Sequence, residues 1–138
     1  MRVDVNRILD YFSHRREVVA LFLFGTFDTP QEREDSDIDI AVLIASDTIK
    51  VAREILKAEY YKASPGFSLR TVDIVILNTA PSFLKHRVLK TGRLLLDRDP
   101  DFRKEFTARA IQEYFDYKPI EETYFKRMKE RLRKVVHG

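Results

Sequence analysis

The sequence predicts an α/β (α+β) domain, with a small mixed β-sheet of three to four strands flanked by helices and a C-terminal helical extension. Three short apolar runs, at residues 18–24, 38–44 and 71–77, have the length and composition of buried strands. Segments between and after these runs repeat apolar residues every three or four positions, which is the period of an amphipathic helix. Strands and helices mixed in this order are typical of one small sheet covered by helices.

The first helix is expected within residues 3–12. Its apolar stripe repeats at the spacing of a helix face and consists of Val5, Ile8, Leu9 and Phe12. Asp4 precedes that stripe and is the predicted N-cap. The run from Val18 to Phe24 is continuously apolar up to Gly25, as expected of a strand buried on both faces.

A second strand follows at residues 38–44, and Asp47 is expected to cap a helix that reaches about Tyr61. The Ser-Pro-Gly sequence at residues 64–66 predicts a turn before the third strand at 71–77. The segment 78–81 then opens another helix that ends at Gly92. A short fourth strand is expected at residues 93–96.

The last part of the chain is predicted to be helical. Asp99 caps this region and Pro100 occupies its first position, where proline is tolerated. Pro119 is expected to kink or break the helix, and a second helical stripe follows it. We therefore divide the chain into a core at residues 1–98 and a C-terminal helical extension of the same domain at residues 99–138.

Composition narrows the class of protein. The chain has 138 residues, 44% of them apolar and 34% charged, which is the balance of one globular domain. It has no cysteine, so disulfides and cysteine-bound metals are excluded. Because no apolar stretch approaches the roughly 18 residues that a membrane span needs, and no signal peptide opens the chain, we expect a soluble cytoplasmic protein.

Two aspartates interrupt the second apolar run. Residues two apart in a strand project on the same face, so Asp37 and Asp39 should lie side by side while Ile38 and Ile40 face the core. Neighbouring carboxylates repel each other unless a cation lies between them, and Mg²⁺ binds carboxylate oxygens together with substrate phosphates. The structural alternative is that Asp37 ends a turn and Asp39 faces water on an edge strand.

Two further features favour a metal site. Gly25-Thr26 directly follows a strand, where a glycine lets the backbone approach a phosphate and a hydroxyl can bond to it. Asp73 lies inside an apolar run, where a carboxylate needs a partner. If the two acidic strands are neighbours, the three aspartates form a cluster that can hold two metal ions.

Gly25-Thr26, ten residues and then Asp37 and Asp39 make a pattern that resembles the signature of the DNA polymerase beta-like nucleotidyltransferases, and within them the minimal nucleotidyltransferases (MNT). The resemblance implies the polymerase beta-like fold. It also implies that Asp37, Asp39 and Asp73 are catalytic and bind two Mg²⁺ ions, with Asp73 also the base toward the acceptor hydroxyl. Gly25 and Thr26 would hold the phosphates of ATP, the substrate.

Proteins of this kind are commonly encoded beside a HEPN-domain ribonuclease toxin. The resemblance therefore implies an antitoxin that transfers AMP from ATP to a tyrosine of that toxin. Two alternatives stay open: an antitoxin that acts by occlusion without catalysis, and a small-molecule nucleotidyltransferase of the aminoglycoside type. The sequence departs from the family pattern at Thr26, which replaces a serine, at Pro30, and in residues 28–35, which carry four acids and one arginine.

Other charged residues have weaker signals. Lys85, His86 and Arg87 follow the third strand, and among them Arg87 is the best candidate for a nucleotide contact. Residues 126–138 carry six Lys/Arg and one Glu, a net charge of +5 against +3 for the whole chain. This basic tail is either a solvated helix face or a contact for a partner protein, a second copy of the chain or, less favoured, RNA.

Overall fold

The computed structural model describes residues 5–25, 37–45, 50–67 and 71–137. It contains four helices and four strands within this part of the chain, joined in part by two short 3-10 turns. In chain order they are α1 (Val5–Ser13), β1 (Val18–Phe24), β2 (Ile38–Ile44), α2 (Lys50–Ala63), the turn Ser64–Gly66, β3 (Val72–Ile76), the turn Leu77–Thr79, α3 (Ser82–Thr91), β4 (Arg93–Asp97) and α4 (Pro100–His137).

The sheet is mixed and has the strand order β3-β2-β1-β4. β1 is antiparallel to both β2 and β4, whereas β2 and β3 are parallel. All seven residues of β1 are buried, as expected of a central strand that is apolar on both faces. The predicted strands and the predicted fold class are therefore confirmed, and the acidic strands β2 and β3 are neighbours.

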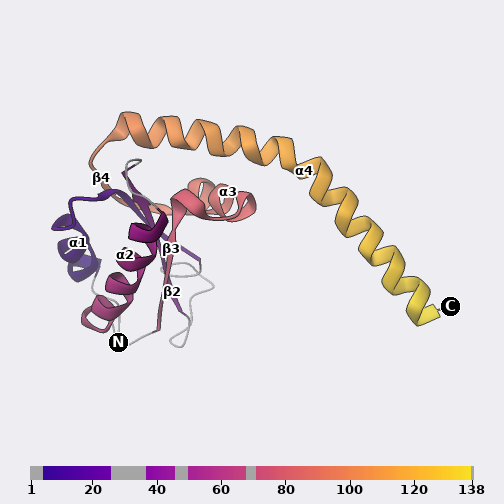
Figure 1. Cartoon of the computed structure of the whole chain (residues 1–138), viewed down its shortest axis with the longest axis horizontal. Coiled ribbons are helices and arrows are strands. Elements are labelled where there is room, and N and C mark those ends of the chain that lie inside the picture. Colours follow the sequence, from indigo (N-terminus) through magenta and orange to yellow (C-terminus); the bar gives the residue numbers. More distant parts are fainter. Residues whose placement is uncertain (1–4, 26–36, 46–49, 68–70, 138) are drawn as a thin grey trace.

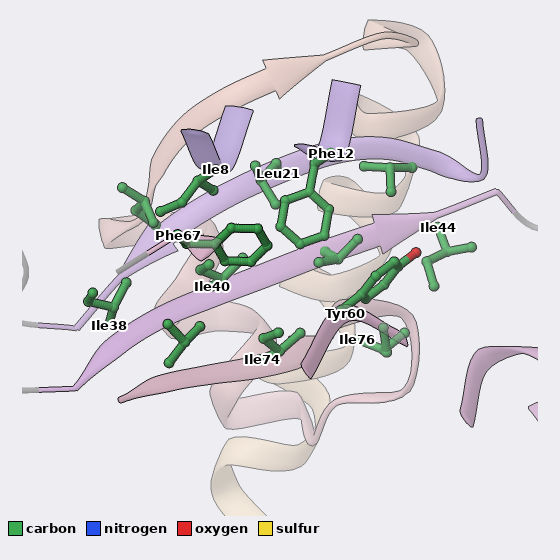
Figure 2. Close-up of a cluster of buried hydrophobic side chains, with 14 residues drawn as sticks. Ile8, Phe12, Leu21, Ile38, Ile40, Ile44, Tyr60, Phe67, Ile74 and Ile76 are labelled. Atoms are coloured by element: carbon green, nitrogen blue, oxygen red, sulfur yellow. The ribbon is translucent and has the colours of Figure 1, made fainter. Parts of the chain in front are cut away.

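Helices cover both faces of the sheet (Figure 1). On one face, α1 and α2 contribute Ile8, Phe12 and Tyr60 to a core with the strand residues Ile38, Ile40 and Ile74 (Figure 2). On the other face, the buried Val88 of α3 joins Phe22 and Leu43, and the partly buried Phe102 and Phe106 of α4 pack against them. Burial of such side chains is the main stabilising contribution to the fold.

The predicted helix caps have different outcomes. The backbone N–H of Phe102 donates to Asp99 Oδ1 over 3.1 Å, which confirms the cap of the last helix. Pro81 is the residue that precedes α3 rather than its first residue, and Gly92 ends that helix as expected. The predicted caps Asp4 and Asp47 lie outside the described residues.

Of the kink or break expected at Pro119, the structure has no break, because α4 runs through this residue as one helix of 38 residues. The helix bends partway along its length, in line with the expected kink (Figure 1). A proline removes one backbone hydrogen bond and crowds the preceding turn, which bends a helix without ending it. The hydroxyl of Thr123 donates to the carbonyl of Pro119 over 2.9 Å, and hydroxyl bonds of this kind to the carbonyl four residues earlier often accompany a bent helix.

The two halves of α4 differ in what they contact. The first half packs on α3, where Lys85 Nζ lies 3.5 Å from Glu113 Oε2 and the ring of His86 stacks on Tyr114 at 3.8 Å. From Phe115 to Val135 every side chain is exposed except the half-buried Glu121. This second half extends beyond the rest of the molecule (Figure 1). Among the described helices, including α4, none is long and apolar enough to cross a membrane.

Candidate functional site

The three predicted acids lie at the β2–β3 side of the sheet. Asp39 of β2 and Asp73 of β3 are register partners in the parallel pair, so their Cα atoms are adjacent. Asp37 directly precedes β2 and is exposed, while Ile38 and Ile40 are fully buried, as predicted from the strand period. The alternative that Asp39 faces water on an edge strand is wrong in one respect, since β2 is an inner strand.

The pKa of Asp39 is raised in the folded protein, and the two other acids contribute to this shift. Burial, and then the charges of Asp73 and Asp37, raise the pKa of Asp39 from 3.8 to about 6, and Arg87 partly offsets this. Both burial and neighbouring carboxylates disfavour the ionised form. The described part of the site is therefore short of positive charge, which is the condition under which a bound cation is stabilised.

Gly25 follows β1 and lies against the same carboxylate. In the antiparallel pair of β1 and β2, Phe24 is the register partner of Asp39. Gly25 has a positive φ of 83°, and a Cβ placed on it would lie 2.1 Å from Asp39 Oδ2. From the sequence, we expected Gly25 to let the backbone approach a phosphate. The structure adds a second reason, because a larger residue would displace the Asp39 side chain.

Tyr61 is a site residue that the sequence analysis did not identify. Its hydroxyl oxygen lies 3.0 Å from Asp73 Oδ1 and 3.2 Å from the carbonyl oxygen of Ile74, and it accepts the Ile74 N–H over 2.9 Å. The tyrosine comes from α2, the helix that packs beside β3. A signal was present in the paired Tyr60-Tyr61, since adjacent residues of a helix point in different directions and only one can enter the core.

The structure separates the three basic candidates on α3. The Arg87 side chain is exposed, and its charge acts on Asp39. Lys85 and His86 instead face α4, where they contact Glu113 and Tyr114 as described above. Arg87 thus remains the candidate for a nucleotide contact, whereas Lys85 and His86 hold α3 against α4.

The donor set suits a hard cation, because carboxylate oxygens are the ligands that Mg²⁺ prefers. Among the described residues, however, no three Asp, Glu or His side chains are grouped closely enough to hold an ion by themselves. Magnesium usually binds through one or two carboxylates and completes its ligands with water and substrate phosphates. Thr26 and the acidic loop at 28–35 lie outside the described residues.

Comparison with known proteins gives the same fold. A family model described as polymerase beta, nucleotidyltransferase, matches residues 6–101. A chain from the crystal structure of a toxin–antitoxin with AMP-PNP is 25% identical, with a TM-score of 0.69 over 90% of this chain and 97% of that one. Comparison with curated proteins gave no match.

Two further solved structures share the fold at lower identity. One is a complex of a tri-AMPylated Shewanella oneidensis HEPN toxin with an MNT antitoxin: 24% identity and a TM-score of 0.65, over 90% of this chain and 94% of that one. The other is the toxin–antitoxin MntA–HepT: 24% identity and a TM-score of 0.64, over 90% of this chain and 95% of that one.

Proposed function

The chain belongs to the polymerase beta nucleotidyltransferase family, and from that premise we propose that it transfers AMP from ATP to a tyrosine of a HEPN-domain toxin and thereby acts as the antitoxin. The observation that carries the proposal is the register of the sheet, which sets Asp39 beside Asp73 and against Gly25. The partner is proposed because similar chains come from complexes of an antitoxin with its toxin, one of them AMPylated.

Each side chain has a role in the proposed reaction. Asp37, Asp39 and Asp73, together with phosphate oxygens of the substrate, would hold Mg²⁺, and the bound metal would supply the positive charge that this acidic site needs before a triphosphate can approach. Gly25 and Thr26 contact the phosphates, and Arg87 adds a positive charge close to Asp39. Asp73 is exposed, so an acceptor on another protein can reach it.

The transfer itself is a substitution at phosphorus. The tyrosine oxygen of the acceptor bonds to the α-phosphorus of ATP, the bond from that phosphorus to the bridging oxygen breaks, and pyrophosphate leaves. The proton of the acceptor hydroxyl passes to Asp73, whose carboxylate is the general base. Positioning and charge neutralisation supply most of the rate enhancement in such reactions.

The second half of α4 is the proposed contact for the toxin. Its exposed apolar side chains include Ile120 at 65%, Tyr124 at 63% and Val135 at 81% exposure, which is unusual for one short segment. The hollow at the bend, about 450 Å³, is lined by residues of this half alone. Six basic residues between 126 and 134 surround the apolar positions, so we expect an acidic rim on the toxin.

The test is transfer of label from α-³²P-ATP, in the presence of Mg²⁺, to the HEPN protein encoded beside this chain. We expect label on a tyrosine of the toxin with the wild-type chain and none with Asp39→Asn or Asp73→Asn. Ribonuclease activity of the toxin should fall in parallel with labelling. Absence of label in the wild-type reaction, with the toxin bound, would contradict the proposed transferase activity.

Neutralisation by occlusion is the second candidate. The exposed face of α4 favours it, because that face can bind a toxin without any chemistry, and so do the four acids in residues 28–35, which repel a triphosphate. The Asp39→Asn variant separates the two functions. If this variant still silences the ribonuclease with no AMP on the toxin, occlusion is the function.

A further inference from the structure

The backbone of β3 is held at its outer edge by one side chain. Among the described strands β3 is the last on its side of the sheet, so half of its N–H and C=O groups have no partner strand there. Tyr61 covers that edge at Ile74, where its hydroxyl oxygen contacts both the N–H and the C=O of the same residue. The hydroxyl is therefore anchored to the backbone one residue after Asp73.

The hydrogen bonds at Tyr61 are limited by the donor and acceptor capacity of its hydroxyl. It carries one proton and can accept at its lone pairs. The Ile74 N–H donates to it, and the single proton can go either to Asp73 Oδ1, at 3.0 Å, or to the Ile74 carbonyl, at 3.2 Å. A bond to a carboxylate is charge-assisted and stronger than one to a neutral carbonyl. The proton is therefore donated to Asp73 whenever that side chain is ionised.

The α2 helix fixes where this donor lies. Tyr60, the preceding residue, is fully buried in the core, and its hydroxyl donates to Glu17 Oε1 over 2.9 Å. Glu17 is in turn bonded to Arg15 Nε over 2.9 Å. Because the neighbouring residue is anchored in this way, Tyr61 projects from a helix position that cannot shift without disturbing the core.

We infer that Tyr61 is a positioning residue for Asp73 in the proposed reaction: it holds Oδ1 in place and leaves Oδ2 as the oxygen for the metal or the acceptor proton. Asp73 is exposed, so without this bond its carboxylate would rotate in water. The inference rests on the proposed function for the role of Asp73, and on the hydrogen bonds alone for the contact.

The test uses Tyr61→Phe, which keeps the ring and removes only the hydroxyl, and Tyr117→Phe as the matched change on the exposed half of α4. The first readout is the affinity for Mn²⁺ measured by electron paramagnetic resonance, with an ATP analogue whose α–β bridge cannot be cleaved. Loss of a residue that orients a metal ligand typically weakens metal binding or activity by about 10- to 100-fold. We expect at least tenfold weaker Mn²⁺ binding for Tyr61→Phe and no change for Tyr117→Phe.

A double-mutant cycle with Asp73→Asn separates positioning from simple coverage of the strand edge. If Tyr61 acts through Asp73, the change in Mn²⁺ affinity on Tyr61→Phe disappears in the Asp73→Asn background. A loss of thermal stability without a change in Mn²⁺ affinity would overturn the inference, and so would an equal loss of affinity in both backgrounds. Because Mn²⁺ binding needs no acceptor, the result is independent of whether the wild-type chain labels a toxin.

Discussion

Replacing Asp39 with Asn should stabilise the protein when no nucleotide or metal is present. Raising the pKa of Asp39 from 3.8 to about 6 corresponds to about 3 kcal/mol of unfavourable free energy in the folded state when the group is ionised. The side chain is only partly buried, and water screens part of this penalty, so we expect about 1 kcal/mol. For a domain of this size that is a rise in Tm of about 4 °C.

The pH dependence of this effect has a definite sign. Because the pKa of Asp39 is higher in the folded state than in the unfolded chain, the folded state loses stability as the pH rises from 3.8 to about 6. Below this range Asp39 is protonated in both states and the variant has no advantage. The gain for Asp39→Asn should be complete above about pH 7 and fall to about half near pH 5.

Thermal unfolding followed by circular dichroism at pH 5 and pH 8 measures both effects, with Asp116→Asn on the exposed part of α4 as the matched control. Adding ATP and Mg²⁺ should reverse the order, because a ligand at 100 times its Kd stabilises the wild type by about 2.7 kcal/mol. A lower Tm for Asp39→Asn than for the wild type at pH 8, or a difference that is equal at both pH values, would refute the reasoning from carboxylate repulsion.

Three further predictions concern the rest of the site and α4. Gly25→Ala should lose AMP transfer and about 1 to 2 kcal/mol of stability, because a side chain is strained at positive φ and its Cβ would displace Asp39; Gly66→Ala, whose Cβ would meet nothing within 4 Å, is the control. Arg87→Gln should raise the pKa of Asp39 further and weaken ATP binding, which NMR titration of the Asp39 carboxyl carbon and calorimetry can measure; an unchanged carboxyl titration would contradict the assigned contact. Truncation after Lys118 should leave a folded core that binds the toxin less tightly and with less salt dependence. If the truncated chain binds the toxin as tightly as the full chain at both low and high salt, the second half of α4 is not a contact.

The sequence alone was sufficient to predict the strands and to place the acids close to one another. Residues 18–24 and 38–44 are apolar throughout apart from Asp39, and short apolar runs of this length favour buried strands. The parallel pairing of β2 with β3 brings Asp39 and Asp73 together, and the resemblance to a known family anticipated it. Gly25 and Arg87 act on Asp39 in the structure, and the nucleotide contacts expected of them stay predictions.

Contacts between side chains from distant segments of the chain could not be predicted from the sequence. The Tyr61–Asp73 bond depends on the angle at which α2 crosses β3, and no local pattern specifies that angle. The fit of Gly25 against Asp39 similarly depends on the register of an antiparallel pair. At Pro119 the local rule left a kink and a break open, and the helix continues because the cost of one missing hydrogen bond does not outweigh the helical turns on either side.

The two halves of α4 should differ in how readily their backbone hydrogen bonds break in solution. The first half packs on α3, but the side chains of the second half are almost all exposed. Because most of the stability of a helix in a protein comes from packing, the second half is expected to be less stable than the first. Amide hydrogens there should exchange by local fraying, while those of β1 exchange only through global unfolding. A protein that covers this segment therefore also orders it, and part of the binding free energy is spent on completing the helix.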